Sequence, residues 1–122
     1  MITIEDIRAI AMTLPGATEK PSYGGRPSWR TSSKMFCWVR EDPEALVLWV
    51  ESVEDAAMLI ETSPDKLFTI DHYNGHAMVL ANLDTIGLDE ATELITDSWR
   101  VRATKTAVKR FDETRKILHT DE

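Results

Sequence analysis

The feature that most constrains the fold is a series of short apolar runs separated by tight polar turns. Runs of this kind cover residues 28–31, 34–40 and 45–51, which are short for helices and rich in Val, Leu and aromatic residues. Ser32-Ser33 separates the first two runs, and the polar, proline-containing segment 41–44 separates the second from the third. Such short connections predict antiparallel strands, because parallel neighbours need a long crossover.

A second pair of strands is expected at residues 66–73 and 76–83. Asn74-Gly75 lies between them and is the strongest short signal for a hairpin, because a type I′ turn needs a positive φ at both central residues. We therefore expect a two-residue turn to join these two strands.

Amphipathic segments predict helices before, between and after the strands. Residues 3–14 place apolar side chains at three-four spacing, and Thr3 with Asp6 fits a capping box at their start. Pro15-Gly16 ends this helix. A second helix is expected to begin at Ser52 and to end before Ser63-Pro64.

The C-terminal part of the chain predicts further helical structure. A helix begins at Leu88, with acidic residues near its start and basic residues near its end, as the helix dipole favours. Residues 104–122 continue with a weaker amphipathic pattern and are interpreted as a helical extension. The stretch 15–28 is rich in Gly, Pro, Ser and Thr and is expected to be a loop.

The predicted element order is α-β-β-β-α-β-β-α, within a single domain that spans residues 1–122. Hairpins dominate, so the fold class is α+β, with two layers, a largely antiparallel sheet and the helices on one face of it. With 122 residues and a hydrophobic fraction of 43%, the chain is long enough to bury a core without metals or disulfides.

Composition limits the cell compartment and the classes of function that we expect for this chain. One cysteine cannot form an internal disulfide, and no run of membrane-spanning length or signal peptide is recognised, so a cytoplasmic protein is expected. The net charge of −7 argues against binding polyanions over the whole surface. Residues 98–116 nevertheless hold seven basic residues and two acidic ones.

Several runs along the chain resemble the MmcQ/YjbR family in the same order, over roughly residues 3–110. The matching pieces are Leu14-Pro15-Gly16, Pro27-Ser28-Trp29-Arg30, Lys34-Met35-Phe36, the run from Lys66 through Asp71, His72 and Asn74-Gly75 to His76, and Ser98-Trp99-Arg100 with Arg102-Ala103 and Lys105. The resemblance implies a two-layer α+β fold similar to secretion chaperones, and a DNA-binding role described as a double wing. It implies no enzymatic activity.

Two positions depart from the family pattern. Ala81-Asn82-Leu83 stands where a basic residue is expected in the second C-terminal strand, and His72 stands where a proline is common. The missing basic residue weakens the DNA-binding interpretation for this chain.

Two groups of residues are candidates for a DNA interface. Phosphate contacts are expected from the basic stripe after residue 98, and the first hairpin is expected to form a wing of aromatic and basic residues. The alternative is a solvated helix whose basic end satisfies the dipole. The candidate residues are Arg100, Arg102, Lys105, Lys109 and Arg110 in the stripe, and Trp29, Arg30 and Lys34 in the wing.

The alternation along the strands predicts a second apolar sheet face. It places Phe36 and Trp38 on one side of their strand, and Val47 and Trp49 on one side of the next. Such a face suits a homodimer or a protein partner, so the alternative function is a chaperone-like interaction module centred on Trp38 and Trp49. Equally, the C-terminal extension or the 15–28 loop could cover it.

Enzymatic chemistry has little support in the sequence. His72 and His76 flank the expected turn, but two imidazoles are too few for a stable zinc site, so no metal and no cofactor are expected. His72 with Tyr73 is a weaker hypothesis for a small ligand pocket. Cys37 lies between apolar neighbours and is interpreted as structural. We therefore expect a protein that is not an enzyme.

Overall fold

The structure is a computed structural model that describes residues 1–120, and of Tyr23 and residues 116–120 only the backbone. Residues 121–122 of the expected extension therefore lie outside the described residues. Helices are α1 (Ile4–Ala11), α2 (Val53–Thr62), α3 (Leu88–Arg102) and α4 (Lys105–Thr120), with a short 3-10 helix η1 (Tyr23–Gly25). Strands are β1 (Thr18–Pro21), β2 (Pro27–Thr31), β3 (Lys34–Glu41), β4 (Glu44–Trp49), β5 (Leu67–Phe68) and β6 (Met78–Ala81).

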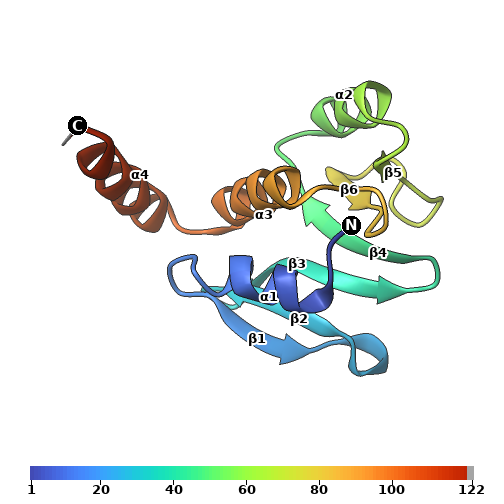
Figure 1. Ribbon diagram of the computed structural model, residues 1–122, viewed down its shortest axis with the longest axis horizontal. Helices are drawn as coiled ribbons and strands as arrows, with labels where there is room; N and C mark the ends of the chain where they lie inside the picture. The colour runs from blue at the N-terminus through green and yellow to red at the C-terminus, as the bar shows by residue number, and fades with distance from the viewer. Residues whose placement is uncertain (121–122) are drawn as a thin grey trace.

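The six strands described form one antiparallel sheet in the order β1-β2-β3-β4-β6-β5 (Figure 1). The α+β class and the antiparallel sheet with helices on one face are thus confirmed. The 15–28 loop is a partial error, because this segment contains β1, which pairs with β2. All four residues of β1 are exposed, so the strand lacks the apolar alternation by which strands are recognised in a sequence.

The tight turn occurs at Ser32-Ser33 and not at Asn74-Gly75, where the sequence predicts it. Ser32 and Ser33 have φ values of 48° and 71°, so they form the tight turn with two left-handed residues that joins β2 to β3. β5 and β6 do pair, but segment 69–77 connects them, and Asn74 does not adopt a positive φ. The two-residue turn predicted at Asn74-Gly75 is therefore wrong. The N–H groups of Tyr73 and Asn74 donate instead to the carbonyl of Ile70.

A β-bulge in β3 changes which side chains enter the core. Trp29 lies opposite Cys37 and Arg30 lies opposite Met35, so Phe36 is an extra residue on β3. Phe36 and Cys37 are both fully buried in the core against the helices. The expectation that Phe36 shares a sheet face with Trp38 is wrong, because the bulge interrupts the alternation.

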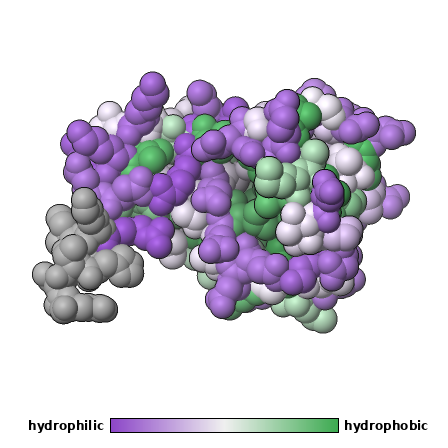
Figure 2. Space-filling view, turned by 90° about the horizontal axis from the view of Figure 1, so that it is seen from above, coloured by the Kyte–Doolittle hydropathy of each residue, from purple (hydrophilic) through white to green (hydrophobic). Residues whose placement is uncertain are grey.

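The main core lies between the sheet and the helices, which lie on one side of it. Large, fully buried members come from α1, β2, β4, α3 and β6: Ile7, Trp29, Leu46, Leu48, Val79, Ile95 and Trp99. Seen from above, hydrophobic areas on the surface are framed by hydrophilic side chains (Figure 2). No helix within residues 1–120 combines the length and the apolar composition needed to cross a membrane.

A smaller apolar cluster lies on the opposite, helix-free face of the sheet. Ala45, Val47 and Leu80 form its centre and are fully buried. Side chains from β3, β5, segment 69–77 and β6 pack against them: Trp38, Phe68, Ile70, Tyr73 and Met78. The expected open apolar face is therefore wrong for this half of the sheet, since the chain itself covers it. Among the described residues, the apolar side chains of this cover come from segment 69–77 and the strands, and not from the 15–28 segment or α4.

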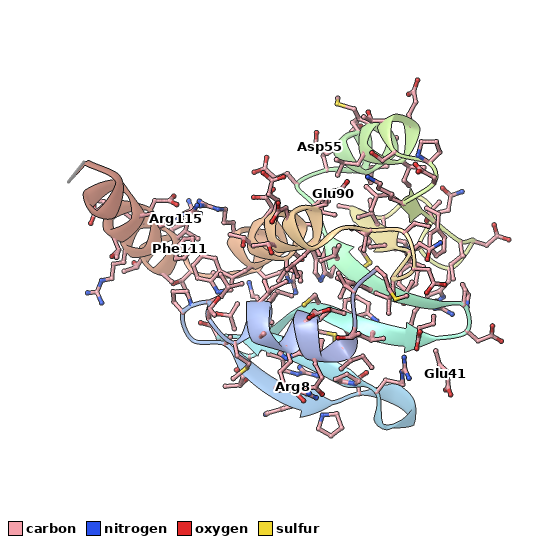
Figure 3. All side chains as sticks on the ribbon, viewed as in Figure 1. Arg8, Glu41, Asp55, Glu90, Phe111 and Arg115 are labelled. Atoms are coloured by element: carbon pink, nitrogen blue, oxygen red, sulfur yellow. The ribbon has the colours of Figure 1, made fainter. Side chains whose placement is uncertain are left out.

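Glu19 of β1 holds α1 against the sheet. Its carboxylate accepts hydrogen bonds from Nε and Nη2 of Arg8, at 2.7 and 3.0 Å, and from Nε1 of Trp29 at 3.0 Å. Figure 3 shows Arg8 on α1, beside β1. The hydrogen bonds from Arg8 hold the pKa of the Glu19 carboxyl below its ordinary value.

Ser98 of α3 ties this helix to two strands. Its buried hydroxyl accepts a hydrogen bond from the backbone N–H of Trp49 at 2.7 Å, and donates to the carbonyl of Phe36 in the bulge. The next residue, Trp99, donates from its indole to the carbonyl of Pro15 at 3.0 Å. The side chains of Ser98 and Trp99 thus fix α3 to β3 and β4 of the sheet and to the segment that follows α1.

Replacing Glu19 with Gln should make stability less dependent on acid pH. A carboxyl whose pKa is lowered on folding stabilises the protein above its unfolded-state pKa, and this contribution is lost as the pH falls through the folded-state pKa. Because Arg8 and Glu19 are partly exposed, we expect Glu19→Gln to lose only about 1 kcal/mol at pH 7 and to match the wild type in strong acid. Urea denaturation at both pH values measures this. An equal deficit at both would contradict it, and Glu61→Gln is the control.

Replacing Ser98 with Ala should destabilise the protein by about 2 kcal/mol. The change leaves the N–H of Trp49 and the carbonyl of Phe36 without a partner in a buried place. Thr96→Ala is the matched control on the same helix, because that hydroxyl donates only to the helix's own Thr92 carbonyl. Urea denaturation monitored by fluorescence compares the two variants. Equal stability of both would show that Ser98 does not anchor α3.

Candidate nucleic-acid interface

Charged side chains are sorted between the two faces of the sheet. Side chains alternate along a strand, and the pairing register aligns the alternation of neighbouring strands. Glu19 reaches the helix side, where it meets Arg8. By the same alternation Lys20, Arg30 and Arg40 lie on the helix-free side, whereas Glu19, Glu44 and the basic residue Lys34 lie on the helix side. Glu41, at the end of β3, lines a cavity together with Trp38 and Arg40.

Trp49 and Arg102 form a stacked pair at one end of the sheet. The guanidinium carbon of Arg102, in the last turn of α3, lies 4.3 Å from the ring centroid of Trp49. Nε1 of Trp49 and Nε of Arg102 are buried and make no hydrogen bond in the described structure. Such a stack adds attraction between the charge and the ring face, and it keeps a cation at the surface of the sheet.

The cations on the helix-free side of the sheet and two half-buried tryptophans together define a surface, which we call the basic sheet face. Arg30 lies opposite Met35 across β2 and β3, and Trp49 follows on β4. Guanidinium groups pair with phosphate oxygens, and indole rings stack on unpaired bases. The basic sheet face consists of Lys20, Arg30, Trp38, Arg40, Trp49 and Arg102.

The predicted wing residues do not lie together on one surface in the structure. Arg30 is half-buried on the helix-free side, and Lys34 is exposed at the end of the hairpin. Trp29 is fully buried against the helices, and its indole N–H donates to Glu19. The prediction that Trp29 contacts DNA is therefore wrong, because its ring has no surface to offer.

The predicted basic stripe is not one continuous surface. Arg100 forms an ion pair with Asp112 at 2.6 Å and a longer one with Asp97 at 4.0 Å, so its charge is neutralised locally. Burial raises the pKa of the Asp97 carboxyl. Arg102 turns to Trp49, whereas Lys105 and the remaining predicted residues, Lys109 and Arg110, are exposed on α4.

Helix α4 extends away from the rest of the molecule (Figure 1). Phe111 of α4 packs edge-on against Trp99, with 5.1 Å between ring centroids. The guanidinium groups of Arg100 and Arg115 each lie 5.4 Å from the ring of Phe111. Figure 3 shows Phe111 and Arg115 near the junction with α3. The exposed lysines of α4 therefore lie apart from the basic sheet face, on a projecting helix that we call the arm.

His72 and Tyr73, the predicted ligand-pocket residues, line a cavity of about 410 Å³. Trp38 and Arg40 of the basic sheet face line the same cavity. The sequence gives no signal for this meeting, because the two pairs lie on different hairpins. Within the described part of the chain, no three His, Cys, Asp or Glu side chains are grouped so that they could hold a metal ion.

The basic sheet face could have been found only in part from the sequence. The adjacent pair Arg40-Glu41 lies in a predicted strand, so its opposite charges could be assigned to opposite faces, whereas Glu19-Lys20 lies in a segment predicted as a loop. The stack of Arg102 on Trp49 was not readable, because it depends on where α3 ends above the sheet.

Comparison with known proteins places this chain among others of similar sequence and shape. The family model described as YjbR matches residues 12–101. Proteins of Mycobacterium tuberculosis and Mycobacterium bovis, both described as uncharacterized, are 27% identical over 91% of this chain and 96% of their own. A crystal structure of Deinococcus radiodurans protein DR2400, with a DUF419 domain, matches with a TM-score of 0.71. It is 24% identical and covers 90% of this chain and 88% of that one, so it supports the fold alone.

Replacing Arg102 with Ala should uncover the ring of Trp49. We expect the tryptophan emission to shift to longer wavelength and quenching by acrylamide to increase, because the guanidinium no longer covers the indole. The loss of stability should be only about 1 kcal/mol, the size of a partly exposed cation–π contact. Lys105→Ala is the control, as this exposed lysine should change neither measurement. Unchanged emission from Arg102→Ala would contradict the stacking.

Proposed function

The chain belongs to the YjbR family, and we propose that this member binds single-stranded DNA on its basic sheet face without catalysing a reaction. The observation that supports the proposal most is the sorting of charge across the sheet. Lys20, Arg30 and Arg40 lie on the helix-free side, whereas Glu19 and Glu44 lie on the other side together with Lys34. A phosphate backbone would meet three strand cations on the helix-free face.

The net charge of −7 is compatible with this role because the potential near a surface depends on the local charges. Arg102 adds a fourth cation to the three on the strands, held over Trp49. The acidic surroundings would repel DNA from other approaches, and so orient the strand on the basic sheet face. The affinity should therefore fall steeply as salt rises, since each neutralised phosphate releases counterions.

Single-stranded DNA suits this surface better than a duplex. Trp38 is half-buried beside Tyr73, where the exposed part of its ring can meet a base only if that base is unpaired. Helices that read duplex DNA enter the major groove, and the described helices α1 to α3 pack on the opposite face of the sheet. The basic sheet face thus offers stacking and phosphate contacts on one extended surface.

A role in binding without catalysis is supported by the state of the reactive groups. Cys37 is fully buried, and burial raises the pKa of its thiol, so the thiolate needed for attack does not form at neutral pH. The alternative of an interaction module rested on an open apolar face around Trp38 and Trp49. Trp38 instead packs on the second apolar cluster, and Arg102 covers Trp49. This removes the observation that favoured a partner there.

Charge reversal on the basic sheet face should weaken DNA binding. We expect Lys20→Glu with Arg30→Glu to weaken binding of a labelled single strand by at least about tenfold, because two phosphate contacts become repulsive. Fluorescence anisotropy at low and near-physiological salt measures the affinity for single-stranded and duplex forms.

The matched control carries the same charge change on the arm. Lys105→Glu with Lys109→Glu alters two exposed lysines of α4 and should leave most of the affinity intact. Circular dichroism verifies that both double variants are folded. Equal losses of affinity in the two variants would contradict the proposal. So would tighter binding of the duplex than of the single strand, or an affinity that does not depend on the salt concentration.

A further inference from the structure

The cavity beside Trp38 deepens the proposed function, on which this inference rests. We propose that it binds one unstacked nucleobase of the strand, and that it prefers a base with an exocyclic amino group. Its volume of about 410 Å³ lies at the lower end of the range for small-molecule sites. Its lining includes Ser22, Gly24, Trp38, Arg40, His72 and Tyr73. The cavity therefore combines aromatic walls with a cation, on the side of the sheet where the strand would lie.

The aromatic walls are already in position. The ring centroids of Trp38 and Tyr73 are 6.2 Å apart with their planes inclined at 56°, and the His72 ring meets Tyr73 edge-on at 4.8 Å. Tyr73 also packs against the second apolar cluster, and its N–H donates to the carbonyl of Ile70 at 2.9 Å. A planar ligand thus finds preformed ring faces and edges, which lowers the entropy lost on binding.

Arg40 places a cation at the cavity. Its guanidinium lies 5.7 Å from the ring centroid of Tyr73. Nε and Nη2 donate to the backbone carbonyls of Pro43 and Asp42, at 3.2 and 2.7 Å, and no ion pair of Arg40 occurs among the described residues. The group is therefore held in place without an ion pair, although Glu41 and Asp42 line the same cavity. Arg40 can pair with the phosphate that is attached to a neutral base.

The acidic residues at the cavity select among bases. Glu41 and Asp42 contribute to its lining and can only accept hydrogen bonds while they are ionised. Cytosine, adenine and guanine offer amino groups to such acceptors, whereas uracil and thymine present a carbonyl oxygen at the corresponding position. The carboxylates would favour the bases that carry an amino group over uracil and thymine, whose exocyclic groups are both carbonyl oxygens and which offer only the single N3–H donor.

Calorimetric titration of the whole protein with dCMP, dUMP and inorganic phosphate tests the inference. dUMP carries an oxygen in place of the amino group of dCMP and an N3–H in place of an acceptor nitrogen, and we expect dCMP to bind at least about fivefold more tightly because it offers the amino donors. Inorganic phosphate tests charge alone and should give no binding at the same concentrations. Equal affinity for dCMP and dUMP, or equal binding of phosphate, would overturn the proposal.

Removing a wall of the cavity should weaken the binding of dCMP. Tyr73→Ala should reduce the affinity at least about fivefold, the loss that one stacked base represents. Phe111→Ala is the matched control, because it removes a partly buried ring at the α3–α4 junction and should leave dCMP binding unchanged. If Tyr73→Ala does not fold, His72→Ala replaces it, since His72 is exposed, and it should weaken dCMP about threefold. Unchanged affinity in a folded wall variant would overturn the proposal.

A parallel assay with single-stranded DNA separates the two proposals. Binding of the strand without binding of dCMP would overturn the nucleobase cavity and leave the basic sheet face supported. Binding of dCMP without binding of the strand would support the cavity and overturn the proposed function.

Discussion

The rest of the structure depends on one buried hydroxyl. Ser98 bridges the carbonyl of Phe36 and the N–H of Trp49, two backbone groups that the bulge and the end of β4 leave outside the regular ladder. Without this bridge both groups would be buried without a partner, which costs far more than a hydrogen bond gains in water. The bridge fixes where α3 crosses the sheet. It thereby determines where Arg102 emerges, one turn later, to meet Trp49.

The bulge and the cover on the helix-free face together give the sheet two different sides. Because Phe36 and Cys37 both face the helices, the main core gains one more large side chain than regular pairing would supply. On the other side, segment 69–77 covers the half formed by β4, β5 and β6, and leaves the half formed by β1, β2 and β3 without a covering element among the described residues. The strand cations Lys20, Arg30 and Arg40 lie in that second half. Tyr73 belongs to the cover and also to the cavity at its border.

The elements with strong periodicity could be predicted from the sequence, and those defined by local geometry could not. The helix boundaries at Thr3 and Ser52 follow from side chains that cap them, and the structure contains both caps. The turn types are less predictable, since Ser32-Ser33 adopts the strained geometry expected of Asn74-Gly75. In the first case, paired strands on both sides impose the geometry. In the second, Ile70 and Tyr73 gain more from burial on the sheet than a tight hairpin would supply.

The two edges of the sheet bear on how molecules of this chain behave toward one another. An exposed strand offers unpaired backbone groups that can recruit the edge of another molecule and begin aggregation. β1 ends in Pro21, which has no N–H to donate, and β5 at the other edge is only two residues long. Glu19 and Lys20 also place charge along the first edge. Both edges therefore discourage sheet extension between copies, which leaves the helix-free face of the sheet accessible in the monomer.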